Sequence, residues 1–354
     1  MSALSRATAS RISLFGLTAA MLVVAGCTSD SSGDPASTIV RTTTSIAGAS
    51  VMGIERDTAA ACPAQTAADS GAGPAVNRHV VHTEGTSEVP SDPQRIVVLD
   101  SASMDAVCAL GLWERVVGAA TGVDSPQPSY LGTGISNIPS IGPVSAPNVE
   151  AIADTKPDLI LGSTPTSDDL YAKLGAVAPT VFAGSDPVYW KAQFALAGQA
   201  LGRAEAAAGE LRRYEEDATR VGASLNASQS QASVVRFGTR NVQLEGPASF
   251  PGQILGDIGA QRPPVQRLTD TPTADIPADR LADAEGDIIY VLFDGSGGRS
   301  YGIDVMKSDQ WQDLGAVADR RVFVAEDQIW NGNGLTAARA VLDDLQATFN
   351  GYSS

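Results

Sequence analysis

The chain has 354 residues, 43% of them hydrophobic, and a formal net charge of −16 at pH 7. This length is enough for two ordinary domains, and the hydrophobic content is typical of a globular body. The acidic excess argues against binding to nucleic acid and against charge-driven binding to anionic lipid.

Residues 1–26 have the pattern of a secretory signal peptide. Arg6 and Arg11 precede an apolar run over residues 12–25, which is too short for a permanent transmembrane helix. The run ends in Ala-Gly before Cys27, and a cysteine at this point resembles the lipobox of bacterial lipoproteins. The resemblance implies that Cys27 carries the lipid, becomes the first mature residue and anchors the protein to the extracytoplasmic face of the cell membrane. A plain signal peptide with a chance cysteine is the alternative.

Residues 27–77 are expected to form a flexible tether, because they are rich in Ser, Thr, Ala, Gly and Asp and show no sustained period. If Cys27 is lipidated, Cys62 and Cys108 remain, and an exported compartment permits disulfides. The even pair suggests a Cys62–Cys108 disulfide that pins this arm to the body. Two free buried thiols are the alternative, and the sequence leaves both open.

An N-terminal α/β lobe is predicted over residues 78–202. Residues 95–99 form a continuous apolar run, which is typical of a strand buried on both faces of a helix-covered sheet. Further strands are predicted at residues 115–118, 157–162 and 179–182, with helices at 105–110 and from Pro147 onward. Strands that alternate with helices indicate an α/β layer architecture.

A single long helix is predicted to link this lobe to a second one. Ala, Glu, Arg and Leu dominate residues 203–221, and the linking segment is assigned to residues 203–224. The alternation then restarts in a C-terminal α/β lobe over residues 225–354. Its strands are predicted at residues 233–237, 287–293 and 321–324, and its helices at 250–258, 279–284 and 335–349. Two α/β lobes joined by one long helix leave a cleft between them, where a ligand is favoured.

Short pieces of sequence stand in a fixed order along most of the mature chain. They are Pro93-Gln94-Arg95-Ile96-Val97, Ala109-Leu110-Gly111, Val116-Val117-Gly118, Ile141-Gly142, Pro147-Asn148-Val149-Glu150-Ala151-Ile152, Lys156-Pro157-Asp158-Leu159-Ile160, Ile276-Pro277-Ala278-Asp279-Arg280-Leu281, Trp311-Gln312-Asp313-Leu314-Gly315-Ala316-Val317 and Arg321-Val322-Phe323. The ordered set resembles the substrate-binding lipoproteins of ABC importers for ferric siderophores, haem and cobalamin, and most of all the ferric-siderophore branch.

This resemblance implies two α/β lobes joined by a rigid backbone helix. It also implies that the protein captures a ferric siderophore and delivers it to an ABC permease. Haem or cobalamin is the alternative ligand, and a structural or adhesive lipoprotein without a small ligand is the alternative function.

In the same family, an acidic residue on each lobe docks onto basic residues of the permease. The matching pieces give this role to Glu150 and Asp279. Both are also predicted in the first turn of a helix, where the helix dipole favours a carboxylate. Stabilisation of the helix start is therefore the alternative role.

Two arginines are candidates for binding the oxygen atoms of an anionic ligand. Arg236 ends a predicted strand and Arg240 lies in the following loop. Loops at strand ends of open α/β sheets are where ligands lie, and the planar guanidinium donates several hydrogen bonds. Salt bridges on an acidic surface are the alternative.

Aromatic side chains in predicted loops complete the candidate site. Trp330 lies beside a Gly/Asn loop and resembles the aromatic cleft residue of the family, whose ring could stack on a ligand. Tyr301 and Arg299 lie in a Gly-rich loop after the most apolar strand, and Tyr130 has a similar place on the other lobe. Either tyrosine could ligate the iron of a haem. Exposed loops without a ligand are the alternative.

Neither direct metal binding nor catalysis is expected. The two histidines, His79 and His82, precede the first buried strand and make a weak ligand set. The sequence contains no nucleophile elbow, no Walker loop and no dinucleotide-binding glycine motif after a strand. We therefore expect binding without turnover and without a resident cofactor.

Overall fold

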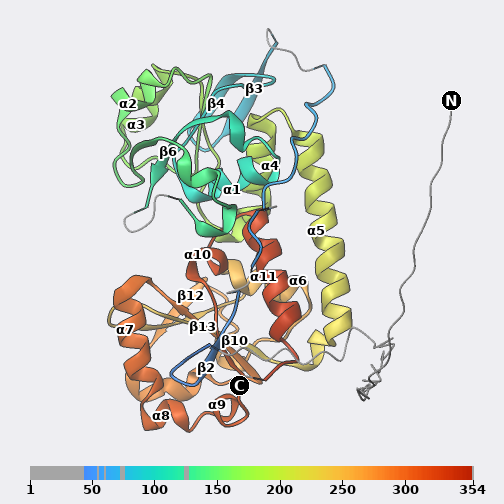
Figure 1. The fold of residues 1–354 in the computed structure, drawn as a ribbon, viewed down its shortest axis with the longest axis vertical. Coiled ribbons are helices and arrows are strands. Elements are labelled where there is room, and N and C mark those ends of the chain that lie inside the picture. Colours follow the sequence, from blue (N-terminus) through green and yellow to red (C-terminus); the bar gives the residue numbers. More distant parts are fainter. Residues whose placement is uncertain (1–43, 54–55, 60, 72–75, 123–126, 353–354) are drawn as a thin grey trace, which may run out of the picture. The chain divides into compact units, whose positions relative to one another are not determined.

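The computed structural model describes residues 44–53, 56–59, 61–71, 76–122 and 127–352 (Figure 1). The signal peptide expected over residues 1–26 and the lipidation site Cys27 lie outside the described residues. Among those that are described, no helix has both the length and the apolar character needed to span a membrane.

The first lobe is built on a five-stranded parallel sheet with the order β7-β6-β5-β8-β9. Its strands are β5 (Ile96–Val98), β6 (Val116–Thr121), β7 (Ser140–Pro143), β8 (Leu159–Gly162) and β9 (Thr180–Phe182). From β5 the chain proceeds to β6 and β7 on one side, and then returns to β8 and β9 on the other. The order therefore reverses between β5 and β8, and at such a switch point the loops diverge and leave a crevice.

Helices cover both faces of this sheet, as its continuous apolar strands require. They are α1 (Ser101–Ala109), α2 (Val149–Asp154), α3 (Leu170–Gly175) and α4 (Trp190–Ala200), with single 3₁₀ turns at Trp113–Arg115, Ser129–Leu131, Ile135–Asn137 and Pro187–Tyr189. An antiparallel hairpin of β3 (Asn77–His82) and β4 (Gly85–Pro90) precedes the sheet.

The predicted linking helix is α5 (Ala204–Leu225), the long helix of Figure 1. At its first turn the backbone N–H groups of Ala204 and Glu205 donate to the carboxylate of Asp69 at 2.9 and 3.0 Å. The side chain of Arg203, at the N-cap position, accepts no hydrogen bond from the first turn of α5. Asp69, which is distant in the sequence, caps the helix in its place.

The second lobe contains a seven-stranded mixed sheet with the order β1-β2-β14-β13-β10-β11-β12. Its strands are β1 (Ser45–Ile46), β2 (Ala49–Val51), β10 (Ala232–Phe237), β11 (Val242–Glu245), β12 (Thr273–Ile276), β13 (Ile288–Phe293) and β14 (Val322–Val324). Its helices are α6 (Phe250–Asp257), α7 (Gly295–Met306), α8 (Asp309–Gln312), α9 (Gly315–Ala318), α10 (Asp327–Trp330) and α11 (Leu335–Thr348), with 3₁₀ segments at Ala227–Gln229, Pro264–Gln266 and Ala278–Ala284. The predicted α/β class with two lobes and a linking helix is confirmed.

The flexible tether expected over residues 27–77 is wrong for its described part. We call residues 44–53, 56–59 and 61–71 the N-terminal arm. Within it, β2 pairs with β14 in parallel, and both Ala49 and Ser50 are buried. The small side chains of this segment hide a strand, because their burial at the sheet edge depends on partners distant in the sequence. In Figure 1 the arm, in blue, runs from β2 to the neighbourhood of α1.

Further contacts fix the arm to both lobes. Arg56 makes an ion pair of 2.6 Å with Asp344 of α11. Cys62 forms a disulfide with Cys108 of α1, so the predicted pairing is confirmed. The arm therefore bridges the sheet of the second lobe and the first helix of the first lobe.

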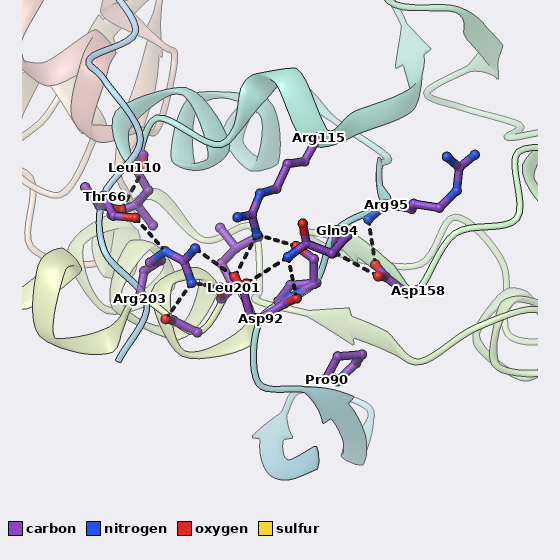
Figure 2. A network of polar contacts seen from close by, with 12 residues as sticks. Thr66, Pro90, Asp92, Gln94, Arg95, Leu110, Arg115, Asp158, Leu201 and Arg203 are labelled. Atoms are coloured by element: carbon purple, nitrogen blue, oxygen red, sulfur yellow. Dashed lines mark hydrogen bonds and ion pairs between the residues drawn. The ribbon is translucent and has the colours of Figure 1, made fainter. Parts of the chain in front are cut away.

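A polar network joins the arm to the start of α5 (Figure 2). Asp92 accepts hydrogen bonds from Arg115 and Arg203 at 2.7 and 2.8 Å, and the Nε of Arg203 donates to the carbonyl of Thr66 at 3.1 Å. Burial opposes ionisation of Asp92, but the two arginines outweigh it and lower the pKa of its carboxyl. Because Arg203 is buried, this network supplies the paired charge that its burial demands.

Candidate ligand-binding site

A cavity of about 260 Å³ opens at the carboxyl ends of β5 and β8, the switch point of the first sheet. Most of its lining comes from the first lobe, and two residues come from the loop between α10 and α11 of the second. The lining residues are Leu99, Asp100, Ser101, Ala102, Val144, Pro147, Ser163, Thr164, Thr166, Leu170, Ser185, Gln193, Gly332 and Asn333. Both lobes therefore contribute to one site, as the sequence predicts for a cleft ligand.

Asp100 holds the two sides of the crevice together. One of its carboxylate oxygens accepts from the backbone N–H of Ser103 at 2.8 Å and caps α1. The other accepts from the backbone N–H of Ser163, just after β8, at 2.6 Å. Because both oxygens have backbone partners, Asp100 positions the loops of the site. It is the one ionisable group among the described residues that line the cavity.

Hydroxyl and amide side chains make up the rest of the polar lining. Thr164 donates to Ser185 at 2.9 Å, and the amide of Gln193 donates to the carbonyl of Asp186 at 2.8 Å. Among the described residues that line the cavity there is no lysine, arginine or histidine. The site can therefore offer many neutral donors and acceptors, but no cation.

Asn333 brings an unused acceptor to this lining. Its backbone is left-handed, with φ of 52°. Its Nδ2 donates to the carbonyl of Asn331 at 3.1 Å, whereas its Oδ1 is buried without a hydrogen-bond partner in the described part of the protein. The side chain is therefore held by its neighbouring loop, and one buried acceptor of Asn333 has no partner in the described structure.

On the second lobe, Arg236 lies at the carboxyl end of β10 and is already paired. Its guanidinium donates to both oxygens of Asp327 at 2.6 and 2.9 Å and lies 3.1 Å from Asp294. Hydrogen bonding to Asp327, which outweighs the cost of burial, raises the pKa of Arg236. Arg240 is exposed and has no ion pair with any described residue.

α10 and the loop after it connect this edge of the second lobe to the cavity. Ser129 of the first lobe donates to Glu326 at 2.7 Å, and Asn331 donates to Asp327 at 2.9 Å. The same loop continues through Gly332 and Asn333 into the cavity wall.

A buried carboxylate fixes the lobes to each other beside the cavity. Asp105 of α1 accepts from the backbone N–H groups of Thr336 and Ala337, at 2.8 and 2.9 Å, in the first turn of α11. It also accepts from the hydroxyl of Tyr130 at 2.9 Å. Complete burial raises the pKa of Asp105 to about 6, against the opposing effect of these hydrogen bonds.

Two aromatic candidates prove to be structural. Trp330 is fully buried, donates from its indole nitrogen to Asp344 at 2.9 Å and packs on Tyr290 with ring centroids 4.6 Å apart. The prediction that its ring stacks on a ligand is wrong, because the one-turn helix α10 directs the ring into the core instead of leaving it in a loop. Tyr130 is likewise buried against Asp105 and does not line the cavity.

The loop expected around Arg299 and Tyr301 is helix α7. Its glycines permit close packing: a Cβ on Gly298 would lie 2.2 Å from the carbonyl oxygen of Phe237, and one on Gly302 would lie 2.6 Å from the ring of Phe293. The Gly-rich pattern therefore marks a tightly packed helix rather than a flexible loop. Tyr301 packs partly buried against the core of the second lobe, and Arg299 is exposed. Neither tyrosine considered for haem lines the cavity.

The two acidic docking candidates are both exposed at helix starts. Glu150 lies in the first turn of α2, which Asn148 caps, and Asp279 lies in the first turn of the 3₁₀ segment Ala278–Ala284. In the described ranges, no group of three or more His, Cys, Asp or Glu side chains could hold a metal ion.

Sequence reasoning missed the residues that line the cavity. Ser101 follows β5, and Ser163, Thr164 and Thr166 follow β8. The available signal was polar residues directly after two buried strands, at the place where the order of the sheet reverses.

Comparisons with known proteins agree with this architecture. A family model described as a periplasmic binding protein matches residues 96–329. YfiY of Bacillus subtilis, a probable siderophore-binding lipoprotein, is 30% identical over 286 residues, which cover 77% of this chain and 87% of that protein. YfmC of the same organism, an Fe(3+)-citrate-binding protein, is 25% identical over 267 residues, which cover 74% and 82%. The crystal structure of Staphylococcus aureus SirA complexed with staphyloferrin B is 25% identical, with a TM-score of 0.66 and coverage of 77% and 98%.

Proposed function

The chain belongs to the periplasmic binding protein family, and on that premise we propose that it captures a ferric siderophore and delivers it to an ABC importer. The observation that carries this proposal is the cavity at the switch point of the first sheet, which residues of both lobes line. Its volume is slightly below the roughly 300–1,000 Å³ of small-molecule pockets. The ligand would therefore extend beyond it toward α10 and the edge of the second lobe.

The relatives support the choice of ligand class. YfiY is named as a probable siderophore-binding lipoprotein, YfmC as a binding protein for ferric citrate, and SirA was crystallised with staphyloferrin B. A lining of hydroxyl and amide groups suits a ligand that is held through hydrogen bonds and released unchanged. The protein in this proposal is a binder without catalytic activity and without a resident cofactor.

Delivery requires a surface for the permease and a position at the membrane. Glu150 and Asp279 each present an exposed carboxylate, one on each lobe, for basic residues of the permease. Lipidation of Cys27 would keep the protein at the extracytoplasmic face of the cell membrane. Arg240 and Arg299 are exposed on the second lobe and are our candidates for contacts with the outer part of the ligand.

Isothermal titration calorimetry of the mature protein with ferric siderophores, haem and cobalamin tests the proposal. We expect one-to-one binding of at least one ferric siderophore, and weaker binding in Thr164→Trp, which places a bulky indole at the cavity wall. Thr219→Trp, on the exposed face of α5, is the control and should bind as the wild type does. Binding of haem alone, or of none of these ligands, would contradict the proposal.

A further inference from the structure

We infer that this site selects an uncharged ferric complex of the hydroxamate class over a triply anionic ferric complex of the catecholate class; this inference rests on the proposed function. The distinction follows from coordination chemistry. A hydroxamate is a singly charged bidentate ligand, so three of them neutralise iron(III). A catecholate is doubly charged, so three of them leave a triply negative complex.

The residues that the structure describes around the cavity offer no cation to such an anion. Its described lining contains neither lysine, arginine nor histidine, and its one ionisable group is the carboxylate of Asp100. Both oxygens of Asp100 are held by backbone N–H groups at 2.6 and 2.8 Å. An anion placed here would lose its hydration without gaining an ion pair, which is costly for any charged group.

The facing edge of the second lobe does not correct this balance. We consider the charged residues that end β10, β13 or β14 or follow these strands within six residues. They are Arg236, Arg240, Arg299, Asp294, Glu326 and Asp327. Three cations and three anions sum to zero formal charge.

Moreover, Arg236, the cation at the carboxyl end of β10, is already paired with carboxylates of the protein. Arg236 binds both oxygens of Asp327 and lies 3.1 Å from Asp294, so a ligand anion would have to displace two carboxylates to reach it. The chain as a whole carries a formal charge of −16, which adds repulsion at long range.

The lining suits a neutral hydroxamate complex. Ser101, Ser163 and Thr166 present hydroxyl groups that can donate to hydroxamate oxygens. The amide of Gln193 and the hydroxyls of Thr164 and Ser185, which also line the cavity, add neutral polar groups that can bind an amide of the siderophore backbone. Each of these contacts joins two neutral groups, so none requires an unpaired charge to be buried.

The test is calorimetric titration with ferrichrome, a neutral trihydroxamate complex, and with ferric enterobactin, a triply anionic tricatecholate complex. We expect ferrichrome to bind at least about tenfold more tightly. Equal or tighter binding of ferric enterobactin overturns the inference and leaves the proposed function standing. If the protein binds neither of these complexes, and also binds neither ferric citrate nor any other ferric siderophore, the proposed function is overturned as well.

Matched variants separate charge from shape, because the two complexes also differ in form. Thr166→Arg places a cation at an exposed position of the cavity wall, and Thr219→Arg places the same charge on the exposed face of α5. Thr166→Arg should shift the affinity ratio toward ferric enterobactin by about tenfold, whereas Thr219→Arg should leave it unchanged. Thr164→Lys serves if Thr166→Arg does not fold. An unchanged ratio in a folded cavity variant overturns the inference.

Discussion

Asp105 supplies the helix cap that Gly334 lacks. The N-cap position of α11 is glycine, which has no side chain to accept from the first backbone N–H groups. The carboxylate of Asp105 occupies the space instead, since a Cβ on Gly334 would lie 2.2 Å from its Cγ. Replacement of either residue should therefore disturb α11 and the contact between the lobes together.

Asp105→Asn should lower the free energy of unfolding by about 2 kcal/mol at pH 7. The amide keeps one acceptor oxygen, but its NH₂ group cannot accept from the second backbone N–H of α11. Loss of such a helix cap costs about 2 kcal/mol of stability. Chemical denaturation followed by circular dichroism measures the effect. Asp304→Asn, at an exposed position of α7, is the control and should have no effect. Equal stability of Asp105→Asn and wild type would show that the cap contributes nothing.

The pH dependence of this difference has a definite sign. The pKa of Asp105 is about 6 in the folded protein and is ordinarily near 3.8. Between these values the native state holds a proton that the unfolded chain has released, so the contribution of Asp105 to stability falls as pH rises through this window. The difference between wild type and Asp105→Asn should thus be largest near pH 4 and level off above pH 6. The change is on the order of 3 kcal/mol.

At the scale of single residues, the sequence predicted types of contact better than their location. Cys62 and Cys108 form the disulfide that their even number suggested, although the sequence left two free thiols as the alternative. Trp330 was wrongly predicted to face the ligand because the Gly/Asn residues beside it indicate a loop. The contact of its ring with Tyr290 depends on α10, which the sequence did not predict. Serine and threonine of the cavity resemble those of any surface loop until the sheet order is known.

At the scale of elements, glycines have two opposite roles. Gly298 of α7 packs directly on the backbone of β10, whereas Gly256 of α6 is exposed with open space where a Cβ would lie. The first permits a helix to approach the sheet, and the second only weakens its helix.

Gly298→Ala should therefore destabilise the protein by about 1–3 kcal/mol, the range for overpacking. The matched change Gly256→Ala should stabilise it by about 0.5–1 kcal/mol, because alanine favours the helix and meets no neighbour. Thermal unfolding of the two variants beside wild type measures both effects. A stabilising Gly298→Ala would contradict the packing that we describe for α7.

The N-terminal arm gives a second prediction at this scale. Replacing Cys62 and Cys108 together by alanine should lower stability by about 3–4 kcal/mol on the chain-entropy account of a loop with a sequence separation of 46. Unfolding of the double variant and of the reduced wild type should agree. If removal of the disulfide leaves stability unchanged, the other contacts of the arm hold it without the covalent bond.

Elements with continuous apolar runs were predictable, and those that depend on distant partners were not. Residues 95–99, 157–162 and 287–293 correspond to β5, β8 and β13 within two residues, because burial on both faces requires such runs. β1 and β2 were missed because they are only two and three residues long, and because β1 pairs with β2 and β2 pairs with the distant β14. α7 was missed because its glycines resemble a loop.

At the scale of the whole molecule, the proposed transport role separates into binding and delivery. Glu150→Ala combined with Asp279→Ala should reduce siderophore-dependent iron uptake by at least about tenfold in cells that depend on this protein, while affinity for the ligand stays the same. The physical reason is the loss of two interfacial charge pairs, each of which can contribute a few kcal/mol.

Helix-start stabilisation is the competing role for these carboxylates, and it predicts a different result. It would lower the free energy of unfolding by a few tenths to about 1 kcal/mol and leave uptake intact. Asp154→Ala, at an exposed position near the end of α2, is the control for a lost surface charge. Normal uptake by the double variant would exclude docking through these two residues.

Two lobes that are joined by a single connection can rotate about it as a hinge, whereas a second, separate connection restricts this rotation. Here α5 is one connection between the lobes, and the N-terminal arm is a second one. The arm pairs with β14 at one end and forms a disulfide with Cys108 at the other. We therefore expect the lobes to keep their relative orientation when a ligand enters or leaves the cavity, whose wall includes Gly332 and Asn333. Small-angle scattering profiles of the protein with and without ligand should accordingly superimpose. The rate of ligand dissociation should change on substitution of Gly332 or Asn333.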